Sequence, residues 1–210
     1  MRNLIYLAFI SLGLPDSIMG VSWPSMRTEW GLEIDALGLV SIVGLISAVL
    51  STFYSGKIIS FLGTGKTVVF SILLTSIGLF GISVALNFIF VLILTIPLFV
   101  GSGALDTALN NYVAINYGAK HMSWLHSFWG IGATLGPIVV SYAIIGRSWR
   151  AGYSSLSMIQ FAIFVLLILS LPLWKQGKNE EVKEQKDKTY KSIIIIRGVK
   201  TSVLIFFVYC

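Results

Sequence analysis

Hydrophobic residues gather in long runs that short polar segments separate. A run of about 18 or more mostly apolar residues can cross the ~30 Å hydrocarbon core of a bilayer as a helix. Six such runs occur, at residues 4–26, 34–54, 67–86, 88–115, 123–145 and 153–174. A seventh begins near Val199 and stops at Cys210, and about twelve residues at 1.5 Å per residue are too few to cross. The pattern predicts an all-α membrane protein with six spanning helices and a truncated seventh.

Composition agrees with this prediction, because 56% of the residues are hydrophobic and only 11% are charged, whereas soluble domains carry about 25% charged residues. We expect a helical bundle over residues 1–174, a charged cytoplasmic linker over 175–198 and the start of a seventh helix over 199–210. The single cysteine, Cys210, excludes an internal disulfide framework and a multi-cysteine metal site. No metal and no cofactor is predicted.

The net charge of +6 does not indicate nucleic acid, because the basic residues lie mostly between the hydrophobic runs. The Lys-rich linker suits the anionic cytoplasmic leaflet. The first run continues past Pro15 without a convincing cleavage site, so we expect a retained helix rather than a signal peptide. The positive-inside rule then predicts a multi-pass protein of the cell membrane with a cytoplasmic N-terminus. This orientation leaves Arg2, Lys57, Lys66, Lys120 and the linker inside, and only Arg27, Arg147 and Arg150 outside.

Two predicted helices carry an aspartate inside the hydrophobic run, in the same local pattern. In each, a glycine is followed by an aspartate three residues later and by a glycine or asparagine four residues after that. The first helix has Gly13, Asp16 and Gly20, with Trp23 on the same face, and the fourth has Gly103, Asp106 and Asn110. Many transporters consist of inverted three-helix repeats in which the first and fourth helices are equivalent. The shared pattern is what such a repeat would leave.

The fifth predicted helix combines a histidine with small residues and a proline. His126, Gly130 and Pro137 share one face, and Trp129 and Gly136 lie beside it. Gly130, Gly132 and Gly136 would allow a neighbouring helix to approach closely, and Pro137 would kink the helix because it removes a backbone hydrogen bond. Packing alone would explain the glycines and the proline, whereas His126 favours a functional role.

A charged aspartate deep in a bilayer costs at least ~2.5 kcal/mol, so it normally faces a wet cavity, is paired or is protonated. A low dielectric favours the neutral carboxyl group, which makes Asp16 and Asp106 candidate proton carriers. Counted from the predicted cytoplasmic helix ends, their depths differ by roughly 5 Å. The alternative is structural: Asp16 would hydrogen-bond a neighbouring helix or the backbone near Pro15.

Six helices, a long linker and the start of a seventh resemble the N-terminal half of a major facilitator superfamily transporter. Residues 55–66 resemble the loop motif of that superfamily, with Gly56 and Gly63 in register and Lys66 one residue late. Ser60 and Phe61 replace the usual acidic and basic residues. The resemblance implies a 12-helix fold built from 3+3 inverted repeats, of which this chain would be the N-terminal half without its C-terminal partner.

The sequence GSGALDTALN, residues 101–110, resembles the fucose permease-like branch, which includes sugar:proton symporters. In that branch acidic residues occupy the positions of Asp106 and Asp16. The resemblance implies proton-coupled symport of a small polar solute such as a sugar by alternating access. Asp106 and Asp16 would carry protons, and the substrate contacts would be Asn110, His126, Trp23 and Trp129.

Other functions remain open at this point. A drug or metabolite exporter of the same superfamily would share these features, and a truncated chain could also be a non-transporting subunit. An enzyme is not expected, because the chain lacks HExxH, GxSxG and Walker motifs and has only two histidines. The sequence identifies neither the substrate nor the direction of transport.

Overall fold

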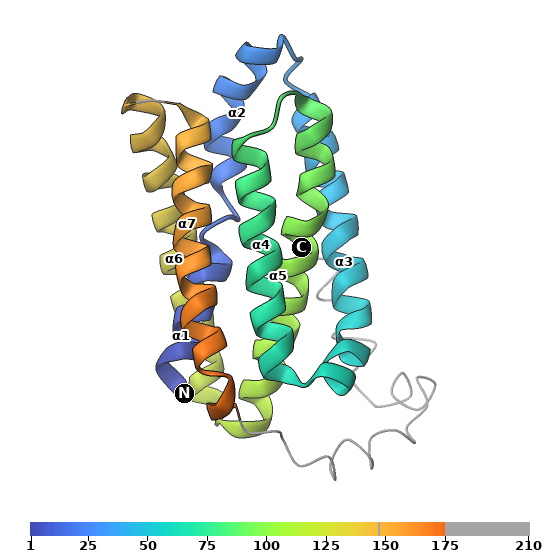
Figure 1. Cartoon of the computed structure of the whole chain (residues 1–210), viewed down its shortest axis with the longest axis vertical. Helices are drawn as coiled ribbons and strands as arrows, with labels where there is room; N and C mark the ends of the chain where they lie inside the picture. Colours follow the sequence, from blue (N-terminus) through green and yellow to red (C-terminus); the bar gives the residue numbers. More distant parts are fainter. Residues whose placement is uncertain (147, 175–210) are drawn as a thin grey trace. The chain divides into compact units, whose positions relative to one another are not determined.

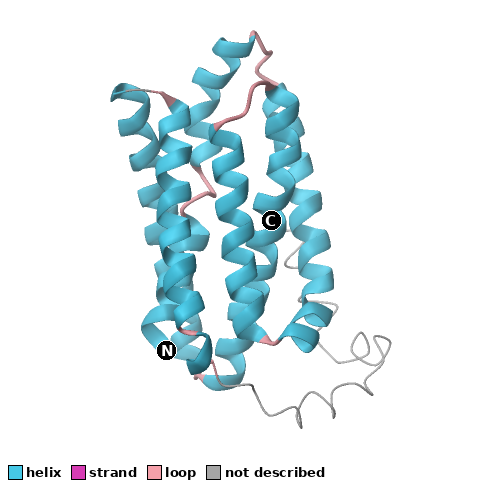
Figure 2. Cartoon of the chain, viewed as in Figure 1, coloured by secondary structure: helices cyan, strands magenta, loops and turns pink. Residues whose placement is uncertain are grey.

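The computed structural model describes residues 1–146 and 148–174, and all regular structure in this part is helical (Figures 1 and 2). The predicted linker and seventh helix lie outside the described residues, as does Arg147. The helices are α1 (Arg2–Gly13), α2 (Ile18–Trp30), α3 (Ala36–Leu62), α4 (Thr64–Ser83), α5 (Phe88–Asn116), α6 (Ala119–Gly146) and α7 (Trp149–Leu169), followed by the 3₁₀ turn η1 (Leu171–Leu173).

Six segments of the described residues are long and apolar enough to span a membrane. The prediction of six spans is therefore confirmed. Helices α3 to α7 form one span each, whereas the first span, Arg2–Trp30, consists of α1 and α2. A non-helical segment at residues 14–17, which we call the break, separates them and is drawn as a loop at mid-height in Figure 2. Pro15 lies in the break and cannot continue the hydrogen bonding of α1, because it has no N–H group.

The segment that the sequence presents as a 12-residue loop, residues 55–66, is mostly helical. Helix α3 continues to Leu62 and includes Gly56, and α4 starts at Thr64 and includes Lys66. Only Gly63 connects the two helices, with a φ of 81° that favours glycine. The expectation of a long loop was wrong, because residues 57–62 contain no helix-breaking glycine or proline and the helix simply continues through them.

The helices pack in pairs that fit an inverted repeat. The first span, α1 with α2, packs on α6; α3 packs on α5; and α4 packs on α7 and also on α5. In span numbers the first three pairings are one with five, two with four, and three with six. Exchanging span one with four, two with five and three with six leaves these three pairings unchanged, whereas the packing of α4 on α5, spans three and four, has no counterpart of similar extent between spans six and one. Gly13 and Gly103 fit the same exchange, because each lies against a backbone carbonyl, that of Trp129 on α6 and that of Ala48 on α3.

Small side chains of α3 allow its close packing on α5. Gly44, Ser47, Ser51 and Ser55 recur every three or four residues and are buried. The Ser51 hydroxyl donates to the Val100 carbonyl of α5 at 2.6 Å. Small residues of this kind let helix backbones approach in a membrane, where no hydrophobic effect drives helices together.

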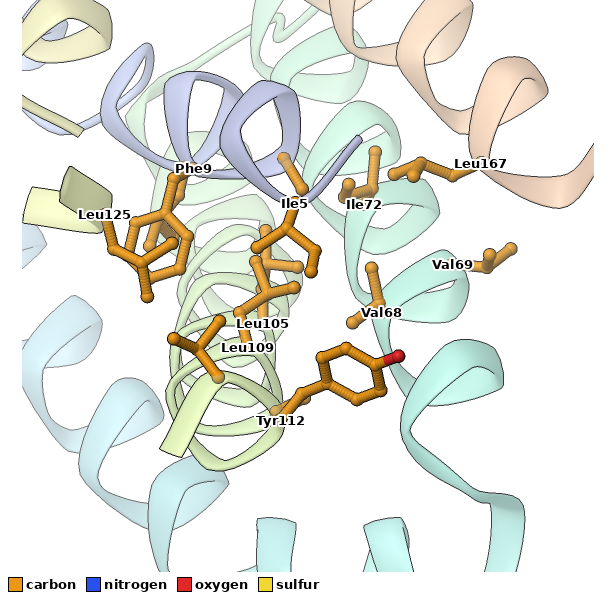
Figure 3. Close-up of a cluster of buried hydrophobic side chains, with 14 of the residues drawn as sticks. Ile5, Phe9, Val68, Val69, Ile72, Leu105, Leu109, Tyr112, Leu125 and Leu167 are labelled. Atoms are coloured by element: carbon orange, nitrogen blue, oxygen red, sulfur yellow. The ribbon is translucent and has the colours of Figure 1, made fainter. Parts of the chain in front are cut away.

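Two apolar clusters fill the bundle. One lies toward the N-terminal end of α1 and contains Ile5 and Phe9 together with residues of α4, α5, α6 and α7 (Figure 3). The other lies around α2 and the starts of α5 and α7, and it contains Trp23, Val91 and Tyr153. The break lies between the clusters, because α1 contributes to the first and α2 to the second.

Arg150 joins three elements near the start of α7. It donates to the Glu29 carboxylate at 2.6 Å and to the Ala85 carbonyl at 3.0 Å. Its guanidinium group stacks 4.3 Å from the ring centre of Trp149, whose indole N–H also donates to Glu29, at 2.8 Å. The end of α2, the turn between α4 and α5 and the start of α7 are thereby linked.

Replacing Arg150 with glutamine is expected to lower the stability of the bundle by about 1 kcal/mol, because a partly exposed ion pair and a cation–π contact are lost. Thermal unfolding in detergent, followed by circular dichroism, measures the change. Glu33→Gln, which neutralises an exposed carboxylate near the start of α3, is the control and should leave the midpoint unchanged. Equal midpoints for Arg150→Gln and the unmodified protein would contradict the prediction.

Candidate functional site

Asp16 lies in the break between α1 and α2, with its side chain exposed in the described unit. Its backbone N–H donates to the Gly13 carbonyl at 3.2 Å, which closes the turn. Its carboxylate accepts a hydrogen bond from the indole N–H of Trp129 on α6 at 2.6 Å. The break thus turns Asp16 out of the packed interior and toward α6.

Asp106 lies in α5, and its side chain is also exposed. The Asn110 amide donates both to the Asp106 carboxylate at 2.8 Å and to the Asp106 backbone carbonyl at 3.0 Å. His126 of α6 is near enough to interact with this carboxylate electrostatically. The Asp106 carboxylate is therefore hydrogen-bonded by a residue of its own helix, and His126 of α6 lies within electrostatic range of it.

The two carboxylates interact electrostatically with each other although ninety residues of chain separate them. They belong to spans one and four, which the inverted repeat makes equivalent. Five of the predicted site residues thus form one group, which we call the polar face: Asp16, Asp106, Asn110, His126 and Trp129.

The surroundings of this group differ from the far side of the bundle. Ser17, Asn111 and Ser127, close in sequence to its members, are exposed as well. On α4 after Lys66, and on α7, the large exposed side chains are apolar, as at Phe70, Phe80 and Phe161. An aqueous or protein-facing surface on one side and a lipid-facing surface on the other would produce this division.

Trp23 does not join the polar face, which corrects the sequence interpretation. Its side chain is 4% exposed and lies in the core, with its ring centre 5.9 Å from that of Phe88. Counting seven residues from Asp16 places Trp23 on the same face only if the helix is unbroken. Because residues 14–17 are not helical, a spacing of seven residues no longer keeps Trp23 on the face of Asp16. The exposed face of α2 contains Gly20 and Pro24 instead.

The predicted packing glycines fall into two groups. A Cβ atom built at Gly13 would overlap the Trp129 carbonyl, one at Gly136 the Leu14 carbonyl, and one at Gly103 would lie 2.7 Å from the Ala48 carbonyl. No atom lies within 4 Å of a Cβ at Gly20 or Gly130, so neither makes a close contact in the described unit. Both positions are open among the described residues, so their predicted packing role stays a prediction.

Gly132 belongs with the first group, because a Cβ there would overlap the Ile10 carbonyl of α1. Gly132 and Gly136 are one turn apart and bring α6 against the end of α1 and the start of the break. Pro137 follows them, yet α6 continues from Ala119 to Gly146 without interruption. The interrupted span is the first one, at Pro15.

Sequence reasoning missed two buried or half-buried polar contacts. Gln160 of α7 is fully buried and donates to the Ser11 carbonyl of α1 at 2.7 Å. The Tyr6 hydroxyl and His121 Nδ1 form a hydrogen bond of 2.7 Å between α1 and α6. A single glutamine in the apolar run 153–174 was a usable signal for the first contact, because an uncompensated amide is costly in a bilayer.

Within residues 1–146 and 148–174, no group of three or more His, Cys, Asp and Glu side chains is arranged to hold a metal ion. The chemistry of the polar face is that of carboxylates, an amide, an imidazole and an indole. Such groups exchange protons and bind hydroxyl groups.

Comparison with known families agrees with the helix arrangement. The sequence model of the Major Facilitator Superfamily matches residues 5–210. No curated protein matches the chain. Because the match covers all but four residues, the chain belongs to the Major Facilitator Superfamily, whose members are secondary transporters that move small solutes across membranes.

Proposed function

We propose that this transporter couples the uptake of a small polar solute, such as a sugar, to protons, and that Asp16 and Asp106 carry the coupling. The observation that supports this most is that two spanning segments each carry a carboxylate whose side chain is exposed in the described unit, within electrostatic range of the other. Intramembrane carboxylates that are exposed rather than packed in the interior commonly mark solute or proton pathways.

The surroundings of the two carboxylates suit a solute with several hydroxyl groups. Each carboxylate accepts hydrogen bonds, the imidazole of His126 both donates and accepts them, and Asn110 offers an amide. The ring of Trp129 is 39% exposed, and such a surface can stack against a sugar ring. Two neighbouring negative charges repel each other, so a proton or a hydroxyl donor between them stabilises the pair.

Transport by alternating access requires a second wall facing the polar face. We propose that a second six-helix bundle of the same superfamily type covers it and that the two bundles rock around the site. The positive-inside rule supports a cell-membrane orientation with the N-terminus in the cytoplasm. We propose that the Lys-rich segment after residue 174 lies on the same side.

Trp129→Phe should reduce proton-driven uptake by about tenfold, because it removes a hydrogen bond to a carboxylate and keeps an aromatic ring. Uptake at a fixed proton gradient, normalised to the amount of protein in the membrane, measures the effect. Trp124→Phe is the matched control, since Trp124 lies on the same helix and is 48% exposed. Equal losses in both variants would argue against a specific role for the indole N–H of Trp129.

The proposal is tested by uptake into proteoliposomes of the full-length transporter with a panel of labelled neutral monosaccharides. An acidic exterior should drive accumulation of at least one of them, and a protonophore should abolish it. If no sugar accumulates and a lipophilic cation is expelled instead, the protein is an exporter and the symport proposal fails.

A further inference from the structure

The break in the first span leaves a backbone carbonyl without its helical partner. In an α-helix the Ser11 carbonyl would accept a hydrogen bond from the N–H of residue 15. Residue 15 is proline, which has no N–H. The last regular bond of α1 joins the Leu14 N–H to the Ile10 carbonyl at 3.1 Å, and the Asp16 N–H turns back to Gly13. Ser11 is fully buried, so its carbonyl needs a partner from elsewhere.

Gln160 supplies that partner. Its side-chain amide donates to the Ser11 carbonyl at 2.7 Å, and the residue is fully buried. Its own amide oxygen has no hydrogen-bond partner among the described residues. An unpaired buried oxygen carries a desolvation cost, and an apolar side chain would avoid it. A glutamine here is therefore explained by its N–H group.

A second bond from α7 reaches the other side of the break. The Tyr153 hydroxyl and the Ser22 hydroxyl of α2 form a hydrogen bond of 3.2 Å, and both residues are buried. Tyr153 and Gln160 are seven residues apart, which is about two helical turns, so they lie on the same face of α7. Helix α7 thus bonds α2 through Tyr153 and α1 through Gln160, and it bridges the break.

We propose that Gln160 is a positioning residue that fixes the end of α1 and thereby sets the position of Asp16. The end of α1 and Asp16 are linked through Trp129, because Gly13 packs on the Trp129 carbonyl while Asp16 binds the Trp129 indole. A displacement of α1 would disturb both contacts. The importance of this placement for transport rests on the function proposed above, whereas the placement itself can be tested without a substrate.

The test uses the full-length protein in membranes with Cys210→Ser and Ser17→Cys. Ser17 is exposed next to Asp16 and reports the break through its labelling rate with a membrane-impermeant maleimide. Gln160→Met keeps the length of the side chain and removes the donor, and it should change the rate by about fivefold, as expected for one lost hydrogen bond. Asn111→Cys, on α5, should label at an unchanged rate in the same variant.

Ser157→Ala is the matched control on α7. Ser157 donates to the Ser76 carbonyl of α4 at 3.0 Å and is buried, but it does not bond either side of the break. Its replacement removes an interhelical bond of the same helix and should leave labelling at position 17 unchanged. An equal change in Ser157→Ala and Gln160→Met would overturn the proposal, because the effect would then be general loosening of α7.

Pro15→Ala gives the decisive comparison, because it restores the N–H that the Ser11 carbonyl lacks. In that background Gln160→Met should no longer change labelling, whatever Pro15→Ala does by itself. An undiminished effect of Gln160→Met in the Pro15→Ala background would overturn the proposal. If Gln160→Met does not fold, recovery of folded protein in the double variant supports the inference, and no recovery overturns it. If the unmodified protein shows no proton coupling, only the proposed function is refuted, because the labelling test of Gln160 does not depend on transport.

Discussion

Asp106→Asn is expected to abolish proton-driven accumulation of the solute while leaving the fold intact. The Asp106 side chain is exposed in the described unit and is bonded mainly to Asn110 of its own helix, so an amide of the same shape fits without repacking. The amide cannot take up a proton, and it removes the charge that His126 faces. Uptake driven by an acidic exterior should fall to the level of empty vesicles.

Exchange without a gradient distinguishes loss of coupling from loss of binding. If Asp106 serves coupling, the variant should still exchange labelled for unlabelled solute across the membrane at equal pH on both sides. Asp35→Asn, at the exposed N-terminal end of α3, is the matched control and should accumulate solute normally. Normal proton-driven accumulation in Asp106→Asn would refute the role of Asp106 in coupling.

Gly136→Ala is expected to have the largest effect on stability, lowering it by about 3 kcal/mol, because overpacking a close backbone contact forces the helices apart. The added methyl group would overlap the Leu14 carbonyl, which belongs to the backbone and cannot move aside as a flexible side chain can. Thermal unfolding of the purified protein in detergent measures this change.

Gly130→Ala, on the same helix, is the matched control for that substitution. Nothing lies within 4 Å of its Cβ position, so the control should be neutral or slightly stabilising, since alanine favours a helix over glycine. Similar unfolding midpoints for Gly136→Ala and the unmodified protein would mean that α1 and α6 are less closely packed than described.

The spanning segments were predictable because insertion into a bilayer depends on the length and polarity of each segment taken by itself. For the same reason Asp16 and Asp106 stood out without any knowledge of the packing. The shared glycine–aspartate spacing also pointed to spans one and four as equivalents, and both glycines lie against a backbone carbonyl of a partner helix.

The environments of individual tryptophans and glycines depended on the neighbouring helices. Trp23 and Trp129 are the same residue type, and each follows a conspicuous polar residue of its own segment, yet one is buried against Phe88 and the other binds Asp16. The sequence could not distinguish the two tryptophans, because the break at Pro15 changes the direction in which the side chains of α2 point relative to those of α1. Gly130 and Gly136 differ in the same way, because only the partner helix determines which glycine is crowded.

Sequence alone therefore determined that this protein crosses the membrane in six segments and carries two carboxylates within them, since both properties follow from local polarity. Only the tertiary structure decided that both carboxylates are exposed within electrostatic range of each other, that Trp129 rather than Trp23 binds Asp16 and that Gln160 supports the break. These are contacts between residues up to 149 positions apart, and only the packing of whole helices brings such residues together.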